Sequence, residues 1–161
     1  MDAFDAIRKR RSVRSYTGES ISREQLLQIV DAGRLAASGN NRQPWEFIIL
    51  TQRETIDQLG DWKGLPKAAA VIAVVLDPAS QWWLEDGSAA VENMLLAAPA
   101  LGLGACWIEG YTLRREAELK TLLGVPAGKR LFTLLPLGWP AEWPVKEKKS
   151  LESVVFWERY P

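Results

Sequence analysis

The chain alternates between short, continuous apolar runs and longer segments whose apolar residues have helical spacing. The first helical segment follows Ser22, which forms a capping-box pattern with Gln25. Its apolar or small positions, three or four residues apart, are Leu26, Ile29, Val30, Gly33, Ala36 and Ala37. We therefore predict a helix that begins after Ser22 and ends near Ser38 and Gly39.

Four other apolar runs have the length and composition of strands. "EFIILT" (46–51) and "AAAVIAVVL" (68–76) are rich in β-branched residues, and the second is continuous, as in a strand buried on both faces. "GACWIEGY" (104–111) predicts a strand that leads into a loop, and "RLFTLLPLGW" (130–139) predicts another buried strand.

Two further segments predict helices of different character. "DGSAAVENMLLAAPAL" (86–101) is apolar almost all round from Ala89 onward, so this helix is either central or covered by a partner. Pro99 should kink it or force an early last turn. "LRREAELKTLLG" (113–124) predicts an amphipathic helix closed by its final glycine. Because strands and helices mix without a strict βαβ repeat, an α+β layered fold is favoured over a doubly wound one.

Composition limits the possible functions. The chain has 161 residues, of which 47% are hydrophobic, and we expect one domain spanning 1–161 that buries about 70% of its unfolded surface. Twenty basic residues balance twenty acidic ones, whereas general polyanion binders are usually more basic. Cys106 is the single cysteine and histidine is absent, which excludes an intrachain disulfide, His-based triads and most zinc sites. We expect no metal.

The N-terminal sequence, "MDAFDAIRKRRS", lacks the apolar core of a signal peptide. No apolar run approaches the ~20 residues of a membrane span. Together with the single cysteine, these features predict a cytoplasmic protein that binds no membrane.

Although the net charge is zero, one segment is strongly basic, "RKRRSVRSY" (8–16). If the chain around Ser12 is extended, Arg10, Ser12 and Arg14 project to one side, because alternate residues of a strand share a face. Two guanidiniums and a hydroxyl suit a phosphate monoester. A solvated basic helix end is an equal alternative for this segment alone. Nucleic-acid binding is disfavoured by the neutral net charge, so we expect no nucleic-acid partner.

A second polar segment, "SGNNRQPWEF" (38–47), places small and amide residues directly before a strand. Amide side chains donate and accept hydrogen bonds, as the edge of a heterocycle requires. By itself, however, the segment is better explained as a helix cap followed by a turn.

Taken together, four segments resemble the nitroreductase family of FMN-dependent oxidoreductases. They are "RRSVRSY", "AASGNNRQPWEF", "ENMLLAAPALGLGACWIEGY" and "LPLGWPAEWPVKEKKSLESVVFWERY". They occur in the family's order and approximate spacing and cover most of the chain. The resemblance implies a central, mostly antiparallel β-sheet flanked by helices. It also implies a homodimer with FMN at the subunit interface, which would explain the all-round apolar helix 89–101.

The resemblance assigns FMN-binding roles residue by residue. The first segment is expected to hold the phosphate, the ribityl chain and the pyrimidine edge of FMN through Arg10, Arg11, Ser12 and Arg14. The segment expected to reach the flavin from the other subunit contains Ser38, Gly39, Asn41 and Gln43. The turn along the isoalloxazine near N5 contains Ile108, Glu109 and Gly110, and the phosphate clamp is completed by Lys146 and Lys148.

Several positions depart from the family pattern. Ala37 replaces a usual proline, Pro99 interrupts the long helix, and Lys148 stands where arginine is common, giving a point charge in place of a bidentate fork. The region 55–88 is short, and larger relatives carry pocket-forming insertions there.

The implied activity is hydride transfer from NAD(P)H through flavin N5 to a nitroaromatic, quinone or similar acceptor, with no protein group as catalytic acid or base. Arg14 is the first candidate for positive charge near flavin N1 and O2, ahead of Lys63 or Lys67. Trp82 and Trp83 could line the substrate pocket, although plain packing is the simpler reading. The alternative function is a flavin-binding or flavin-processing protein of the same fold without nicotinamide-dependent turnover.

Overall fold

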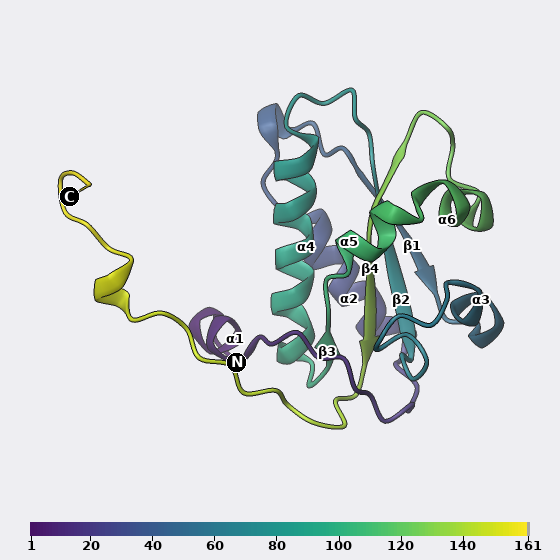
Figure 1. Ribbon diagram of the computed structural model, residues 1–161, viewed down its shortest axis with the longest axis horizontal. Coiled ribbons are helices and arrows are strands. Elements are labelled where there is room, and N and C mark those ends of the chain that lie inside the picture. Colours follow the sequence, from purple (N-terminus) through teal and green to yellow (C-terminus); the bar gives the residue numbers. More distant parts are fainter. Residues whose placement is uncertain (161) are drawn as a thin grey trace.

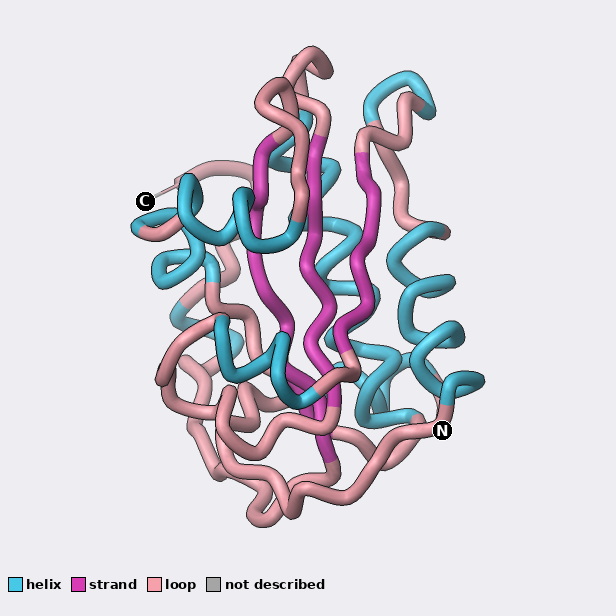
Figure 2. The backbone as a smooth tube through the Cα atoms, turned by 90° about the vertical axis from the view of Figure 1, so that its right-hand side faces the viewer, coloured by secondary structure: helices cyan, strands magenta, loops and turns pink. Residues whose placement is uncertain are grey.

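A computed structural model gives the structure of the protein and describes residues 1–160. Its centre is a four-stranded antiparallel sheet with the strand order β1-β2-β4-β3 (Figure 2). The strands are β1 (Trp45–Leu50), β2 (Ala70–Leu76), β3 (Gly104–Ala105) and β4 (Arg130–Gly138). The helices are α1 (Ala3–Lys9), α2 (Arg23–Arg34), α3 (Arg53–Gln58), α4 (Trp83–Ala100), α5 (Glu109–Arg114) and α6 (Glu116–Leu123). This architecture confirms the predicted α+β fold with an antiparallel sheet.

Hydrophobic cores lie on both faces of the sheet, with α4 on one side and α3 and α6 on the other (Figure 1). Every residue of β2 is buried, as its continuous apolar run predicts. Ile72 and Val74 pack toward α2 and α4, while Val71 and Ala73 pack toward α3 and α6. The sheet is therefore the middle layer of three, because successive side chains of a strand point to opposite faces.

The helices α2 and α4 cross closely. A Cβ added at Gly33 would lie 2.8 Å from Met94 Cγ, so the glycine permits the approach. Asn93 Nδ2 also donates a hydrogen bond to the Ala32 carbonyl at 3.0 Å. This packing accounts for much of the burial of α4.

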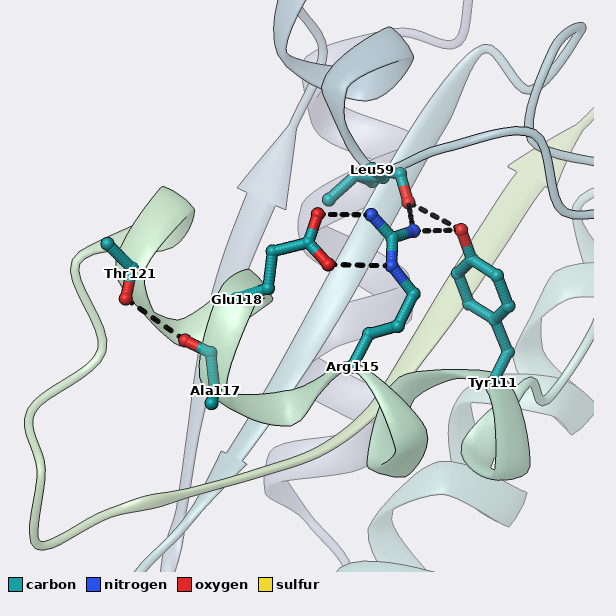
Figure 3. Close-up of polar contacts among 6 residues, drawn as sticks. All are labelled: Leu59, Tyr111, Arg115, Ala117, Glu118 and Thr121. Atoms are coloured by element: carbon teal, nitrogen blue, oxygen red, sulfur yellow. Dashed lines mark hydrogen bonds and ion pairs between the residues drawn. The ribbon is translucent and has the colours of Figure 1, made fainter.

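A polar network holds α5 and α6 against the chain that follows α3 (Figure 3). The Arg115 guanidinium donates to the Leu59 carbonyl and to the Tyr111 hydroxyl, and Tyr111 in turn donates to the same carbonyl at 2.7 Å. Glu118 accepts from Arg115 Nε at 2.9 Å. The network fixes the position of α5, whose first turn contains two of the expected site residues.

Three predicted elements differ from the structure. α2 ends at Arg34, earlier than predicted, and its last turn tightens as the Ala36 N–H bonds to the Gly33 carbonyl at 3.1 Å. The strand predicted at 104–111 has only two regular residues, although the Ile108 N–H still bonds to the β4 carbonyl of Leu134 at 3.2 Å. The helix α5 then begins at Glu109.

The helix predicted at 113–124 is instead the end of α5 followed by α6, because the chain leaves helical geometry at Arg115 (φ −119°). The polar contacts of Arg115 with Leu59 and Tyr111 oppose a straight helix there. Gly124 closes α6 with a left-handed φ of 67°, as predicted. Pro99 falls in the last turn of α4, so only the Leu95 carbonyl loses a helical donor and the helix continues to Ala100.

The C-terminal tail, residues 144–160, leaves the body of the molecule beside α1 (Figure 1). Just before it, Trp143 Nε1 donates to the Lys9 carbonyl at 2.9 Å. From residue 145 to 160 every residue is exposed, including Trp157 at 83% and Leu151 at 71%. Among the described residues, no helix is both long and apolar enough to cross a membrane.

Candidate functional site

The basic segment runs along the outer edge of β3. Ser12 forms a parallel bridge with Ala105, and the Val13 N–H donates to the Ala105 carbonyl at 3.0 Å. Val13 is fully buried against Gly104. The Tyr16 hydroxyl donates to the carbonyls of Val13 (2.7 Å) and Pro136 (3.0 Å), and burial raises the pKa of Tyr16, which keeps it protonated. The segment is therefore anchored on both sides of Ser12.

Cys106 is buried directly after Ala105, the residue that Ser12 bridges. Burial raises the pKa of the Cys106 thiol, while the charges of Arg14 and Arg10 and a hydrogen bond with Ser12 act in the opposite direction. Ser12, which bridges Ala105, is therefore next to this buried sulfur, and Arg10 and Arg14 lie two residues away from Ser12 in the chain on either side. We expect an anion that binds this segment to lie near Ser12, between the two cations.

The neighbouring cations have different partners. Arg10 Nε lies 3.5 Å from Glu92 Oε1 of α4, and the Arg10 side chain is 21% exposed. The Arg11 guanidinium turns back and donates to the carbonyls of Arg8 and Arg10, both at 2.7 Å. It stabilises the C-terminal end of α1 in this arrangement.

Arg14 is exposed, whereas Arg10 and Arg11 are half-buried. Its guanidinium lies over the Trp62 ring, 5.9 Å from the centroid, and donates to the Ser12 carbonyl at 3.3 Å. Lys63 and Lys67, the weaker candidates for charge near the flavin, lie in the same loop as Trp62.

The amide-rich segment forms a strained turn between α2 and β1. Asn40, Asn41 and Gln43 all have left-handed φ values, of 51°, 54° and 50°. The Ser38 hydroxyl accepts the Gln43 N–H at 3.0 Å, and Gly39 N–H donates to the Asp86 carboxylate at 2.9 Å. Left-handed non-glycine residues persist only where surrounding contacts enforce them, and such strain clusters at functional sites.

The third expected segment begins α5. Ile108 is buried, and its carbonyl accepts from the Thr112 hydroxyl at 2.9 Å. Glu109 follows it, partly exposed, in the first helical turn. A Cβ at Gly110 would meet nothing within 4 Å, so the surface there opens into free space. A flat ligand could approach the backbone at this turn.

The remaining expected residues lie apart from these segments. Lys146 and Lys148 are in the exposed tail, and within residues 1–160 the structure records no contact between them and the basic segment. Trp82 is 38% exposed and packs on Gly39. Trp83 is half-buried, with its ring edge toward Phe132 and the Arg130 guanidinium 5.4 Å from its centroid. Trp83 therefore has a packing role in this chain.

Sequence reasoning overlooked two carboxylates at these segments. Glu92 faces Arg10, and Asp86, only 4% exposed, holds Gly39. Acidic residues are common near helix N-termini because their charge interacts favourably with the helix dipole. The sequence alone therefore does not indicate that Asp86 has a further role. Glu92 lies on the exposed side of α4, one position before Asn93, and no local pattern connects it with residue 10.

The donor set fits a flavin mononucleotide. Arg10, Ser12 and Arg14 provide charge and hydrogen-bond donors for a phosphate or a pyrimidine edge. Trp107 Nε1, directly before Ile108, is buried and has no hydrogen-bond partner among the described residues. No cluster of three or more potential metal ligands occurs in residues 1–160.

Comparison with known proteins identifies close relatives. The model of the Nitroreductase family matches residues 7–69 and 62–139. A protein from Archaeoglobus fulgidus, provisionally named NADH dehydrogenase/NAD(P)H nitroreductase, is 38% identical over 88% of this chain and 87% of its own. The NADPH-flavin oxidoreductase of Vibrio harveyi is 26% identical over 99% of this chain and 75% of its own.

A solved structure shows the same fold with a ligand. It is a protein from Desulfovibrio desulfuricans, provisionally named a nitroreductase, in complex with FMN. It is 33% identical, with a TM-score of 0.88, and the match covers 100% of this chain and 99% of that one.

Proposed function

Because the chain belongs to the nitroreductase family, we propose that it is an FMN-dependent oxidoreductase that transfers hydride from NAD(P)H to a nitroaromatic, quinone or similar acceptor. The main structural support for FMN as the cofactor is the placement of the basic segment, in which Ser12 bridges Ala105 at the edge of β3 with Arg10 and Arg14 on either side of it in the chain. The FMN complex of the Desulfovibrio desulfuricans relative supports the same cofactor.

When bound, FMN would supply the redox chemistry, which is the transfer of hydride from the nicotinamide to the acceptor. The residues of this chain bind and orient it. Arg10 and Ser12 hold the phosphate, and Arg14 places positive charge toward the pyrimidine edge. Ile108, Glu109 and Gly110 would border the ring, because the missing Cβ of Gly110 leaves open space at this turn. No side chain is required as an acid or base.

The proposed active form is a homodimer in which each flavin contacts both chains. The helix α1 has exposed apolar residues, Phe4 at 68% and Ile7 at 54%, and lies beside the start of a tail that also carries exposed apolar side chains. An isolated chain would leave this surface in water, and large exposed apolar patches usually mark interfaces. The segment 38–43 and the clamp lysines Lys146 and Lys148 then come to the basic segment of the other subunit.

One experiment tests the cofactor and the activity together. The purified protein, or the apoprotein after addition of FMN, should be yellow, and NADH or NADPH added without oxygen should bleach it. A subsequent addition of a quinone or nitroaromatic should restore the colour. A protein that stays yellow with both nicotinamides is a flavin binder without turnover, and a colourless protein that takes up no FMN contradicts both functions.

A further inference from the structure

We propose that Asp86 and Trp82, at the N-terminal end of α4, are positioning residues that hold the 38–43 loop in its flavin-binding conformation. This inference rests on the proposed function, because the loop is expected to contact the flavin. Neither residue belongs to the basic segment or to the turn at 108–110. Both act through the loop and touch no reacting atom.

The carboxylate of Asp86 provides the first contact. Its Oδ1 accepts the Gly39 N–H at 2.9 Å across 47 positions of sequence. The residue is only 4% exposed, and Oδ2 has no hydrogen-bond partner among the described residues. A buried carboxylate with one unpaired oxygen destabilises a fold. Its single contact to the loop gives a functional reason for keeping it.

The ring of Trp82 provides the second contact. A Cβ added at Gly39 would overlap Cε3 of this ring and lie 3.0 Å from Cδ2 and Cζ3. Gly39 does not have a left-handed φ, so the tryptophan, and not the backbone conformation, requires a glycine there. Trp82 is the N-cap residue of α4, and its carbonyl accepts the Asp86 N–H at 2.8 Å, so both residues belong to the start of the helix.

The loop needs such support because its own conformation is unfavourable. Asn40, Asn41 and Gln43 have left-handed φ values, which cost free energy in non-glycine residues. The internal bond from the Gln43 N–H to the Ser38 hydroxyl closes the turn but does not fix it to the body of the protein. Asp86 and Trp82 supply that attachment and so determine where the amide side chains of Asn41 and Gln43 are presented.

Flavin affinity distinguishes a positioning role from loss of the phosphate clamp. Because the loop is expected to contact the ring system and not the phosphate, Asp86→Ala should weaken FMN and riboflavin by the same factor, about tenfold. Asp86→Asn retains an Oδ1 acceptor and should recover both affinities to within about threefold. Glu85→Ala is the matched control, since it removes an exposed acidic residue from the same first turn. It should leave both affinities unchanged.

Amide exchange of Gly39 in the apoprotein provides a readout without flavin. Asp86→Ala should accelerate the exchange, whereas Glu85→Ala should not. A separate experiment tests the steric contact. Gly39→Ala should weaken the binding of both flavins in the parent protein. The loss of affinity should be much smaller in a Trp82→Ala background, where the added methyl group has room.

Three results would overturn the proposal: unchanged Gly39 exchange in Asp86→Ala, a loss of affinity for FMN but not for riboflavin, or an equal effect of Glu85→Ala. A parent protein that takes up no flavin would instead defeat the proposed function. The exchange rate of Gly39 would still decide whether Asp86 holds the loop.

Discussion

Adjacent cations of the basic segment have different partners, and their contacts separate their roles. Arg8 is 74% exposed in its side chain and pairs weakly with Asp5 at 3.8 Å. Arg11 binds carbonyls at the end of α1, whereas Arg10 faces Glu92 of α4. Sequence alternation predicts that Arg10, Ser12 and Arg14 share a side. It cannot predict Glu92, because that contact depends on how α1 meets α4.

The clamp role of Arg10 predicts a selective loss of affinity. Arg10→Ala should weaken FMN about tenfold to a hundredfold, since a charge-assisted hydrogen bond contributes about 1.5–3 kcal/mol. Riboflavin lacks the phosphate and should bind almost as before. Calorimetric titration of the apoprotein with both flavins measures the difference.

The control for this prediction is Arg8→Ala, which removes an exposed cation two residues away. It should change either affinity by less than about 0.5 kcal/mol, as surface substitutions usually do. An equal loss for FMN and riboflavin in Arg10→Ala, or a comparable loss in Arg8→Ala, would contradict the clamp.

Glu92 should oppose phosphate binding. Its carboxylate lies 3.5 Å from Arg10 Nε and adds negative charge near the site expected for a phosphate. Glu92→Gln frees the guanidinium, so FMN should bind about twofold to fivefold tighter, in keeping with the ~0.4–1 kcal/mol of an exposed ion pair. Riboflavin affinity should not change. Weaker FMN binding by the variant would show instead that Glu92 orients Arg10 for the phosphate.

At the scale of secondary structure, prediction succeeded where burial alone determines the element. The apolar runs that became β2 and β4 were located to within two residues, and the capping box at Ser22 does begin α2. Prediction failed where a contact with a residue distant in sequence determines the element. The break at Arg115 depends on Leu59. The helices α1 and α3 were not predicted, because seven and six residues are too few to show a clear helical periodicity.

The contact between α6 and β4 predicts a pH-dependent stability. Glu116 accepts from Arg130 Nε and Nη2, both at 2.8 Å, and from the Leu131 N–H at 3.0 Å. The hydrogen bonds from Arg130 hold the pKa of Glu116 below its ordinary value. The ionised carboxylate therefore stabilises the fold above that ordinary value, and this contribution is lost as the pH falls through the lowered pKa.

Glu116→Gln should lower the free energy of unfolding by about 1 kcal/mol near pH 7. The difference from the parent should shrink below about pH 4, where the parent's own carboxylate becomes protonated. Urea unfolding at several pH values measures it, with the exposed Glu19→Gln as the matched control. A difference that stays constant down to pH 3 would rule out the ion pair as its cause.

At the scale of the whole molecule, the residues expected to bind FMN do not all lie together in the single chain. The basic segment and the turn at 108–110 both border the short strand β3, since Ser12 bridges Ala105 there. The two tail lysines lie in exposed chain beyond α1, without contact to that segment within residues 1–160. Sequence order reveals which segments belong to a site, but not which chain supplies each, because that depends on an interface between folded surfaces.

Truncation of the tail tests whether a second chain completes the site. The parent should have a light-scattering mass near twice its 18.0 kDa monomer. Removal of residues 144–160 should give a monomer that no longer retains FMN, because the apolar side chains of the tail and both clamp lysines are lost together.

Substitution separates these two losses. Lys146→Ala with Lys148→Ala leaves the apolar side chains of the tail intact, so the protein should remain dimeric while FMN binds roughly fivefold more weakly per lysine, or about 1 kcal/mol each. Phe156→Ser with Trp157→Ser leaves both lysines intact, and FMN content should fall together with the dimer fraction. A parent protein with a mass near 18.0 kDa and full flavin occupancy would mean that one chain suffices, because no second subunit would then be needed to supply the loop or the lysines.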